Sequence, residues 1–307
     1  MKIISITGAT GLLGKNIIDK LSGDSFKVRV LIRNLPKAKE IFEGKENISF
    51  HKWDLNSSPE DTASIIKGSD VLVNLAGPSV GGKRWNDKVK AELFNSRVFT
   101  TKNIVKSMQL SGSNTMKLIS PSGVGFYGFH GDEILTENDP PGDDFLAKLC
   151  KNWETQALKA RDFGSKVCII RTGIVLDKNE GALPQLTAPF KFFAGGWQAS
   201  GKQYISWIHI EDAADLYVYF IKNELEGVFN ACTQTPVTNK EFNKTIGSVM
   251  HRPCLFPVPA FAMKLLLGEF ADNVINGQRV IPQQTLEAGY QFKYTDLKTA
   301  LKSLIST

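Results

Sequence analysis

The sequence is poor in the residues that mark disulfide-rich and metal-binding proteins. Its 307 residues hold four cysteines and four histidines, and no C-x-x-C pair or histidine-rich tract brings them together. We therefore predict no metal site, and we expect reduced core cysteines, as in a protein of the cytoplasm. These cysteines are Cys150, Cys168, Cys232 and Cys254.

Long apolar runs and concentrated charge are also missing. No stretch approaches the roughly 18 to 20 apolar residues of a membrane span, and no apolar signal-peptide core precedes the first glycines. The net charge of +6 is modest, and the lysines are spread along the chain. We expect no membrane contact, no nucleic-acid partner, and a monomer or homodimer that binds a small, anionic molecule.

Apolar runs alternate with amphipathic stretches through the first half of the chain. This pattern predicts strands at 2–7, 27–32, 48–52, 71–75, 116–120, 166–171 and 227–231. The helices are predicted at 11–22, 36–42, 59–67, 88–110 and 144–163. Such alternation indicates an α/β fold, a doubly wound (Rossmann) parallel sheet with right-handed crossovers.

The pattern loosens after residue 172 and becomes mainly helical from residue 237. We predict a dinucleotide-binding domain from residues 1–172 and 206–232. A smaller, mainly helical C-terminal lobe, formed by residues 173–205 and 233–307, would cover the substrate. Residues 257–292 are expected to pack as helices across the cleft, because their apolar run is unsuited to water.

Three glycines follow the first predicted strand. Gly8 would permit the tight turn, Gly11 a close approach of the backbone to a phosphate, and Gly14 close packing of the helix. The N-terminus of that helix offers free N–H groups to an anion. The predicted contacts with a dinucleotide in this turn are Gly8, Thr10, Gly11, Leu12, Leu13 and Gly14.

The end of the second strand discriminates between the two nicotinamide cofactors. Enzymes that use NAD place an acidic residue there, whereas this chain has Arg33 and no acid before Glu40. An arginine can pair with the 2′-phosphate that only NADP carries. The sequence therefore favours NADP(H), with a solvated surface role as the alternative for Arg33.

The G-x-x-G-x-x-G spacing resembles that of the extended short-chain dehydrogenases. The chain is similar over its whole length to a narrower group, the "epimerase family" proteins, which have their own C-terminal domain. Motifs that carry this resemblance are "NLAG" at Asn74–Gly77, "SRVFTT" at Ser96–Thr101, "RTGIVL" at Arg171–Leu176 and "GQRVIPQQTLEAGYQF" at Gly277–Phe292. The resemblance implies cofactor contacts at Asp54, Leu55, Asn74, Ala76 and Gly77.

The chain departs from that superfamily at its catalytic pair. Ordinary members use a tyrosine and a lysine as Y-x-x-x-K, and the matching positions here are Leu146 and Cys150. The remaining hydroxyls near the end of the fifth strand are Ser122 and Tyr127. We predict these two as the catalytic hydroxyls, the alternative being a polar turn.

Several residues could contact a substrate. The candidates are Arg84, Trp85, Arg97, Arg171 and His209. Each has a plain structural alternative. Asp212 is expected to cap or open a helix over residues 213–221. We predict an NADP(H)-dependent oxidoreductase or epimerase-like enzyme acting on a small hydroxy or carbonyl compound, free or nucleotide-linked. The rival prediction is a catalytically silent NADP(H) sensor or scaffold.

Overall fold

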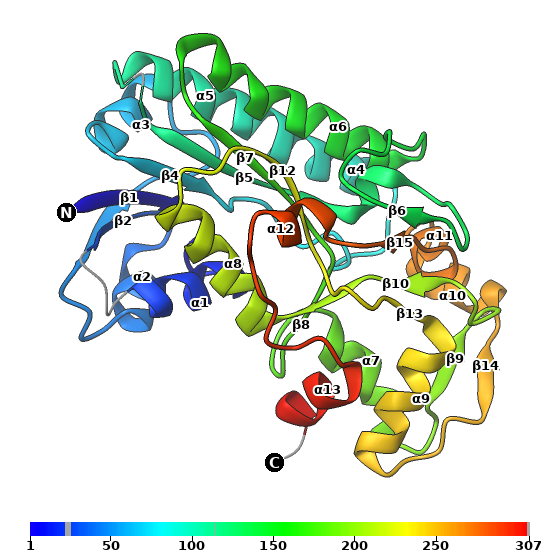
Figure 1. Ribbon diagram of the computed structural model, residues 1–307. Coiled ribbons are helices and arrows are strands. Elements are labelled where there is room, and N and C mark those ends of the chain that lie inside the picture. The colour runs from blue at the N-terminus through cyan, green and yellow to red at the C-terminus, as the bar shows by residue number, and fades with distance from the viewer. Residues whose placement is uncertain (22–25, 114, 306–307) are drawn as a thin grey trace.

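A parallel sheet of seven strands forms the centre of the computed structural model, which describes residues 1–21, 26–113 and 115–305 (Figure 1). The strand order is β12-β7-β5-β4-β1-β2-β3, with parallel pairing throughout. The strands are β1 (Lys2–Thr7), β2 (Phe26–Ile32), β3 (Ile48–Lys52), β4 (Val71–Asn74), β5 (Lys117–Gly123), β7 (Val167–Thr172) and β12 (Gly227–Ala231). The predicted doubly wound α/β fold is confirmed.

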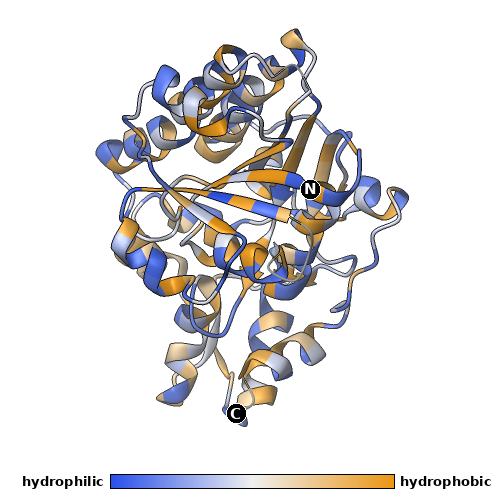
Figure 2. Ribbon diagram, turned by 90° about the vertical axis from the view of Figure 1, so that its left-hand side faces the viewer, coloured by the Kyte–Doolittle hydropathy of each residue, from blue (hydrophilic) through white to orange (hydrophobic). Residues whose placement is uncertain are grey.

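Helices cover both faces of this sheet (Figures 1 and 2). One apolar core lies between the sheet and α1 (Leu12–Leu21), α2 (Leu35–Ile41) and α8 (Ile210–Lys222). A second lies between the opposite face and α3 (Pro59–Ile66), α5 (Thr100–Leu110) and α6 (Phe145–Leu158). The strands between these layers are mostly apolar, as a parallel sheet buried on both faces requires.

The single helix predicted at 88–110 is interrupted. The structure has α4 (Asp87–Phe94), a π-helical turn over Asn95–Phe99, and then α5. The prediction of one continuous helix is therefore wrong. A π turn inserts an extra residue into the helical ladder, and hydrophobic periodicity alone does not reveal it. Such turns are frequent at functional sites.

The C-terminal lobe is mainly helical and has its own core. Its helices are α7 (Ala182–Lys191), α9 (Asn239–Met250), α10 (Ala260–Leu267), α11 (Ala271–Ile275), α12 (Gln283–Glu287) and α13 (Leu297–Ile305). Short strands join it together, pairing β8 (Ile174–Leu176) with β11 (Trp207–His209), β9 (Gly196–Gln198) with β14 (Phe256–Val258), β10 (Tyr204–Ile205) with β13 (Val237–Thr238), and β6 (Ile134–Leu135) with β15 (Arg279–Val280).

The predicted packing of residues 257–292 holds for only part of that segment. Thr285 of α12 is fully buried, and its hydroxyl donates to the carbonyl oxygen of Asn230 on β12 at 2.8 Å. Helix α10, in contrast, buries none of its residues, and Phe261 and Leu265 are largely exposed. The segment therefore contacts the sheet through α12, whereas its most apolar helix, α10, does not pack into the core.

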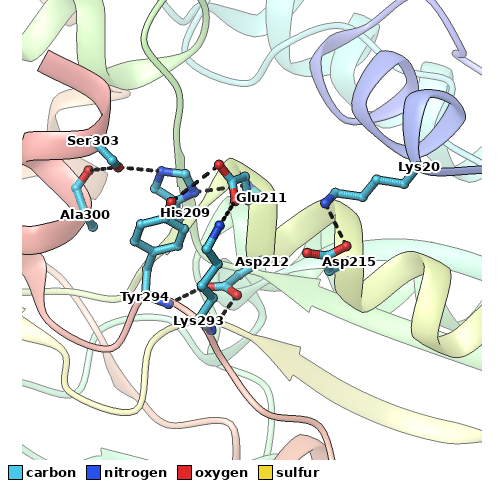
Figure 3. A network of polar contacts seen from close by, with 9 residues as sticks. All are labelled: Lys20, His209, Glu211, Asp212, Asp215, Lys293, Tyr294, Ala300 and Ser303. Atoms are coloured by element: carbon cyan, nitrogen blue, oxygen red, sulfur yellow. Dashed lines mark hydrogen bonds and ion pairs between the residues drawn. The ribbon is translucent and has the colours of Figure 1, made fainter. Parts of the chain in front are cut away.

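Asp212 lies in the first turn of α8 but is not its cap, which corrects the capping half of the expectation. The helix begins at Ile210, and His209 caps it, with Nδ1 accepting from the backbone N–H of Glu211 at 3.1 Å. The Asp212 carboxylate instead accepts the backbone N–H groups of Lys293 and Tyr294, each at 2.8 Å (Figure 3). Asp212 thus holds the C-terminal segment against α8.

The His209 ring attaches α13 to the same place. It stacks on Tyr294 with 3.7 Å between ring centroids, and its Nε2 lies 3.1 Å from the Ser303 hydroxyl (Figure 3). Only 2% of His209 is exposed, and this burial lowers its pKa to about 4. Neutral imidazole is therefore the form that the fold requires, because Nδ1 must accept the capping bond.

This arrangement predicts an acid-sensitive contribution to stability. Between pH 6.5 and 4 the unfolded chain binds a proton at His209 that the folded chain excludes, so the free energy of unfolding falls as the pH falls. The loss can reach about 3 kcal/mol over that window. Urea unfolding of His209→Asn, which keeps a capping side chain, should show a shallower pH dependence. Equal slopes for the two proteins would contradict this reading.

Candidate cofactor and active site

The glycine turn is shaped by close approaches of the backbone. Gly8 has φ +65°, and a Cβ there would lie 2.5 Å from the carbonyl oxygen of Leu75. A Cβ at Gly14 would lie 2.6 Å from Cα of Ala9. Gly11 is exposed, and its N–H donates to the Gly8 carbonyl oxygen at 3.0 Å. Glycine is therefore needed at Gly8 and Gly14 for steric reasons.

A groove of about 950 Å³ lies at the carboxyl ends of β1, β2, β3 and β4. Its lining residues are Gly8, Thr10, Leu31, Ile32, Arg33, Asn34, Lys37, Trp53, Asp54, Leu55, Asn56, Ala76, Gly77, Pro78, Glu92, Asn95, Ser96, Phe99 and Thr100. Seven of the predicted cofactor residues are among them: Gly8, Thr10, Arg33, Asp54, Leu55, Ala76 and Gly77. Open parallel sheets bind ligands at this edge.

The other predicted cofactor residues do not line the groove. Gly11 and Gly14 belong to the turn and to α1, whereas Leu12 and Leu13 pack partly into the apolar cores. Asn74 is 1% exposed; its Oδ1 accepts from the Thr7 hydroxyl at 2.7 Å. Asn74 thus ties the end of β4 to the end of β1, beneath the groove.

The groove also contains residues that the sequence prediction missed. Lys37 lies in the first turn of α2, four residues after Arg33, and the side chain of Asn34 caps α2 by accepting the Lys37 N–H at 3.1 Å. A second cation so close to Arg33 is visible in the sequence and could have identified Lys37. Phe99 and Glu92 come from a segment far along the chain, on the groove's opposite wall.

The two predicted catalytic hydroxyls lie in one buried network. Ser122 donates to Oε1 of Glu154 at 2.6 Å, and Arg171 forms a bidentate ion pair with that carboxylate at 2.9 and 2.8 Å. Arg171 also donates to the Tyr127 hydroxyl at 3.0 Å, and Tyr127 donates to Oδ1 of Asn230 at 2.8 Å. Both oxygens of the carboxylate are therefore engaged.

The two hydroxyls differ in accessibility. Tyr127 is fully buried, whereas Ser122 keeps 6% of its surface exposed. Burial raises the pKa of Tyr127 above its ordinary value, so the phenol stays protonated at neutral pH. With its hydroxyl held by Arg171 and Asn230, Tyr127 is fixed on the inner side of the network. Their catalytic roles stay predictions.

Comparison with known proteins defines the family. The NAD dependent epimerase/dehydratase family model matches residues 4–232, and a domain of unknown function matches residues 258–304. The chain belongs to the NAD-dependent epimerase/dehydratase family.

Three relatives illustrate this membership. The "Epimerase family protein SDR39U1 homolog, chloroplastic" of Arabidopsis thaliana is 37% identical over 98% of this chain and 86% of its own. The structure of human epimerase family protein SDR39U1 with NADPH has 28% identity and TM-score 0.82, covering 98% of each chain. A nucleoside-diphosphate sugar epimerase from Corynebacterium glutamicum has 33% identity and TM-score 0.77, covering 99% of this chain and 58% of its own.

Leu146 and Cys150, which we predicted to match the usual catalytic pair, lie where α6 packs against the end of β5 and the turn after it. That match stays a prediction. Helix α6 is capped by Asp144, and it packs against the end of β5. A Cβ at Gly125 would lie 3.2 Å from Leu146, and one at Gly123 would lie 3.9 Å from Sγ of Cys150. Burial raises the pKa of the Cys150 thiol to about 11, so this thiol is not a ready nucleophile.

None of the five predicted substrate residues lines the groove. Trp85 is buried, packed against Phe145 and Phe270, while Arg84 lies exposed beside it. The other three are buried. Arg97 lies behind the groove wall, Arg171 in the ion pair with Glu154, and His209 against Tyr294. Their substrate roles stay predictions.

In the described residues, no group of three or more His, Cys, Asp or Glu side chains is arranged to hold a metal ion. All four cysteines are free. No helix within the described ranges has both the length and the apolar character needed to cross a membrane.

The buried ion pair generates a stability prediction. Glu154→Gln or Arg171→Met leaves one buried charge without its partner, which should lower the free energy of unfolding by about 3–5 kcal/mol. Tyr127→Phe removes only a hydroxyl, and should lower it by about 1–3 kcal/mol. Calorimetric unfolding of the three variants checks this order. A loss for Tyr127→Phe equal to that for Glu154→Gln would contradict it.

Proposed function

We propose that the chain is an NADP(H)-dependent oxidoreductase or epimerase-like enzyme that acts on a small hydroxy or carbonyl compound. The observation that carries the cofactor choice is the pair of cations, Arg33 and Lys37, on the groove wall at the end of β2. No acidic residue accompanies them on that strand end. The NADPH bound to the human relative supports the same choice.

The acidic residues of the groove are engaged elsewhere. Glu92 pairs with Lys83 at 3.1 Å, and Asp54 accepts the backbone N–H of Asn56 at 2.8 Å. Arg33 and Lys37 are therefore left to bind an incoming anion. A 2′-phosphate between them would form charge-assisted hydrogen bonds, which NAD cannot form with its 2′-hydroxyl.

Proton transfer is assigned to Ser122 acting with Glu154. Bound NADP(H) would supply or accept the hydride. The Ser122 hydroxyl points its proton at a carboxylate 2.6 Å away, so it can accept a proton from a substrate hydroxyl as it passes its own to Glu154. Arg171 holds that carboxylate in place through two hydrogen bonds. Tyr127 then keeps Arg171 oriented.

The substrate proposed is small, and either free or nucleotide-linked. The Corynebacterium relative, named as a nucleoside-diphosphate sugar epimerase, supports the nucleotide-linked choice. The excess of positive charge on the chain suits a phosphorylated molecule of this class.

A second candidate is a catalytically silent NADP(H) sensor or scaffold. Leu146 and Cys150 at the positions of the usual catalytic pair favour it, since neither can replace a tyrosine or a lysine. The two candidates share the cofactor groove and differ in whether substrate turns over.

Cofactor preference tests the groove assignment. NADPH should bind about ten- to a hundredfold more tightly than NADH, and Arg33→Ala should remove most of this preference with little change for NADH. Isothermal calorimetry measures both affinities. Lys39→Ala, on the exposed side of α2 and outside the groove, is the matched control. Equal affinities for the two cofactors in the unmodified protein would overturn the NADP(H) assignment.

Turnover tests the proton-transfer assignment. Hydroxy and carbonyl compounds, including nucleotide-linked sugars, are screened through the change in NADPH absorbance. Ser122→Ala should then reduce kcat by about a hundred- to ten-thousandfold while the NADPH affinity is kept. A Ser122→Ala variant with full activity would exclude the relay. Tight cofactor binding with no turnover across the panel would favour the sensor.

A further inference from the structure

Arg97 is a buried cation for which the described part of the chain provides no acidic partner. Its side chain is 8% exposed, and no carboxylate of the described residues lies within 4.0 Å of the guanidinium. Its partners are neutral: the carbonyl oxygen of Pro78 at 2.7 Å, that of Leu93 at 3.4 Å, and the Ser96 hydroxyl at 3.5 Å. Burying a charge without a counter-charge is costly, so this placement needs an explanation.

The guanidinium lies directly behind the groove wall. A Cβ at Gly77 would lie 3.5 Å from Cζ of Arg97, and both Gly77 and Pro78 line the groove. On its far side the guanidinium is 5.4 Å from the centre of the Trp153 ring. One peptide layer therefore separates the charge from the groove, and an aromatic ring closes the space behind it.

This part of the wall faces the glycine turn. The Gly8 backbone is pressed against Leu75 and Ala76, and the Ala76 N–H donates to the Thr7 hydroxyl at 3.2 Å. The glycine turn and the N-terminus of α1 would hold the diphosphate of a dinucleotide. The wall formed by Gly77 and Pro78, in front of Arg97, would then border that diphosphate.

We propose that Arg97 is a positioning residue whose buried charge is balanced by the diphosphate of the bound cofactor. The inference rests on the proposed dinucleotide binding. Arg97 acts in two ways: it holds the Gly77–Pro78 wall through the Pro78 carbonyl, and its field, weakly screened at this depth, favours an anion in front of that wall. Burial lowers the pKa of Arg97, which is consistent with a charge that no acidic side chain of the described residues compensates.

The π-helical turn explains how one short segment both lines the groove and places Arg97 behind it. Asn95, Ser96 and Phe99 line the groove, whereas Arg97 and Val98 are buried behind it. The extra residue of the turn directs Arg97 toward Trp153 while its neighbours stay on the groove side.

Three substitutions separate charge from hydrogen bonding. Arg97→Lys keeps the charge, Arg97→Gln keeps a donor for Pro78 without the charge, and Arg97→Met keeps neither. We expect Arg97→Lys to bind NADPH within about threefold of the unmodified protein, and Arg97→Gln and Arg97→Met to bind it about tenfold more weakly. An Arg97→Gln variant that binds as tightly as Arg97→Lys would overturn the proposal.

Ligand fragments locate the effect. ADP-ribose carries the diphosphate, so its affinity should fall in Arg97→Gln as that of NADPH does. Adenosine 2′-phosphate lacks the diphosphate and should bind all the proteins equally. Equal losses for both fragments would assign Arg97 a general structural role instead. Thermal unfolding of each variant without ligand shows whether a loss of affinity is only the result of a loss of stability.

The unmodified protein provides a test that needs no variant. In nitrogen-15 NMR of arginine-labelled protein, the buried Arg97 Nε–H signal should shift on saturation with ADP-ribose and stay in place with adenosine 2′-phosphate. An unchanged signal with bound ADP-ribose would contradict the proposal. Failure of the unmodified protein to bind NADPH or ADP-ribose at all would instead refute the proposed function.

Discussion

The buried ion pair between Arg171 and Glu154 is the interaction on which the carboxyl-end side of β5, β7 and β12 depends. It joins β7 to α6, and through Ser122 and Tyr127 it reaches β5 and the turn after it. Asn230 extends the network to β12. A complete buried ion pair adds little to the free energy of folding, whereas the loss of one partner lowers the stability severely. The residues of this network therefore depend on one another.

The network also links the two parts of the chain. Glu137 accepts the backbone N–H of Asn230 at 2.8 Å and that of Gln284, in α12, at 3.1 Å. The C-terminal lobe is therefore fastened to the carboxyl edge of the sheet through the same polar cluster that fixes Ser122. A second attachment, at His209 and Asp212, holds the last helix against α8 (Figure 3). These two attachments fix the C-terminal lobe to the sheet domain that carries the groove.

Local features were predictable from the sequence. The strands and the glycine turn follow from short-range patterns, and the groove does contain Arg33, Asp54 and Gly77. The position of Arg171 at a strand end was also predicted correctly. Its guanidinium, however, is paired with the carboxylate of Glu154, which belongs to another element. Pairing between distant segments is invisible to periodicity.

The same reason explains the errors. Asp212 was expected to cap α8, but pairing of β11 with β8 brings the helix start forward to Ile210 and gives the cap to His209. The π turn at Asn95–Phe99 broke a helix whose apolar pattern was continuous. In both cases tertiary contacts determined an element boundary that local propensity had placed elsewhere.

The central claim is that a preformed NADP(H) groove operates beside a locked ion-pair network rather than beside a tyrosine–lysine pair. A crystal structure of the intact protein with NADPH tests it most directly. The account predicts the 2′-phosphate between Arg33 and Lys37, the nicotinamide beside Ser122, and Tyr127 still bonded to Arg171 and Asn230. A nicotinamide bound away from Ser122, or a Tyr127 hydroxyl released from Arg171 to contact it, would contradict the account.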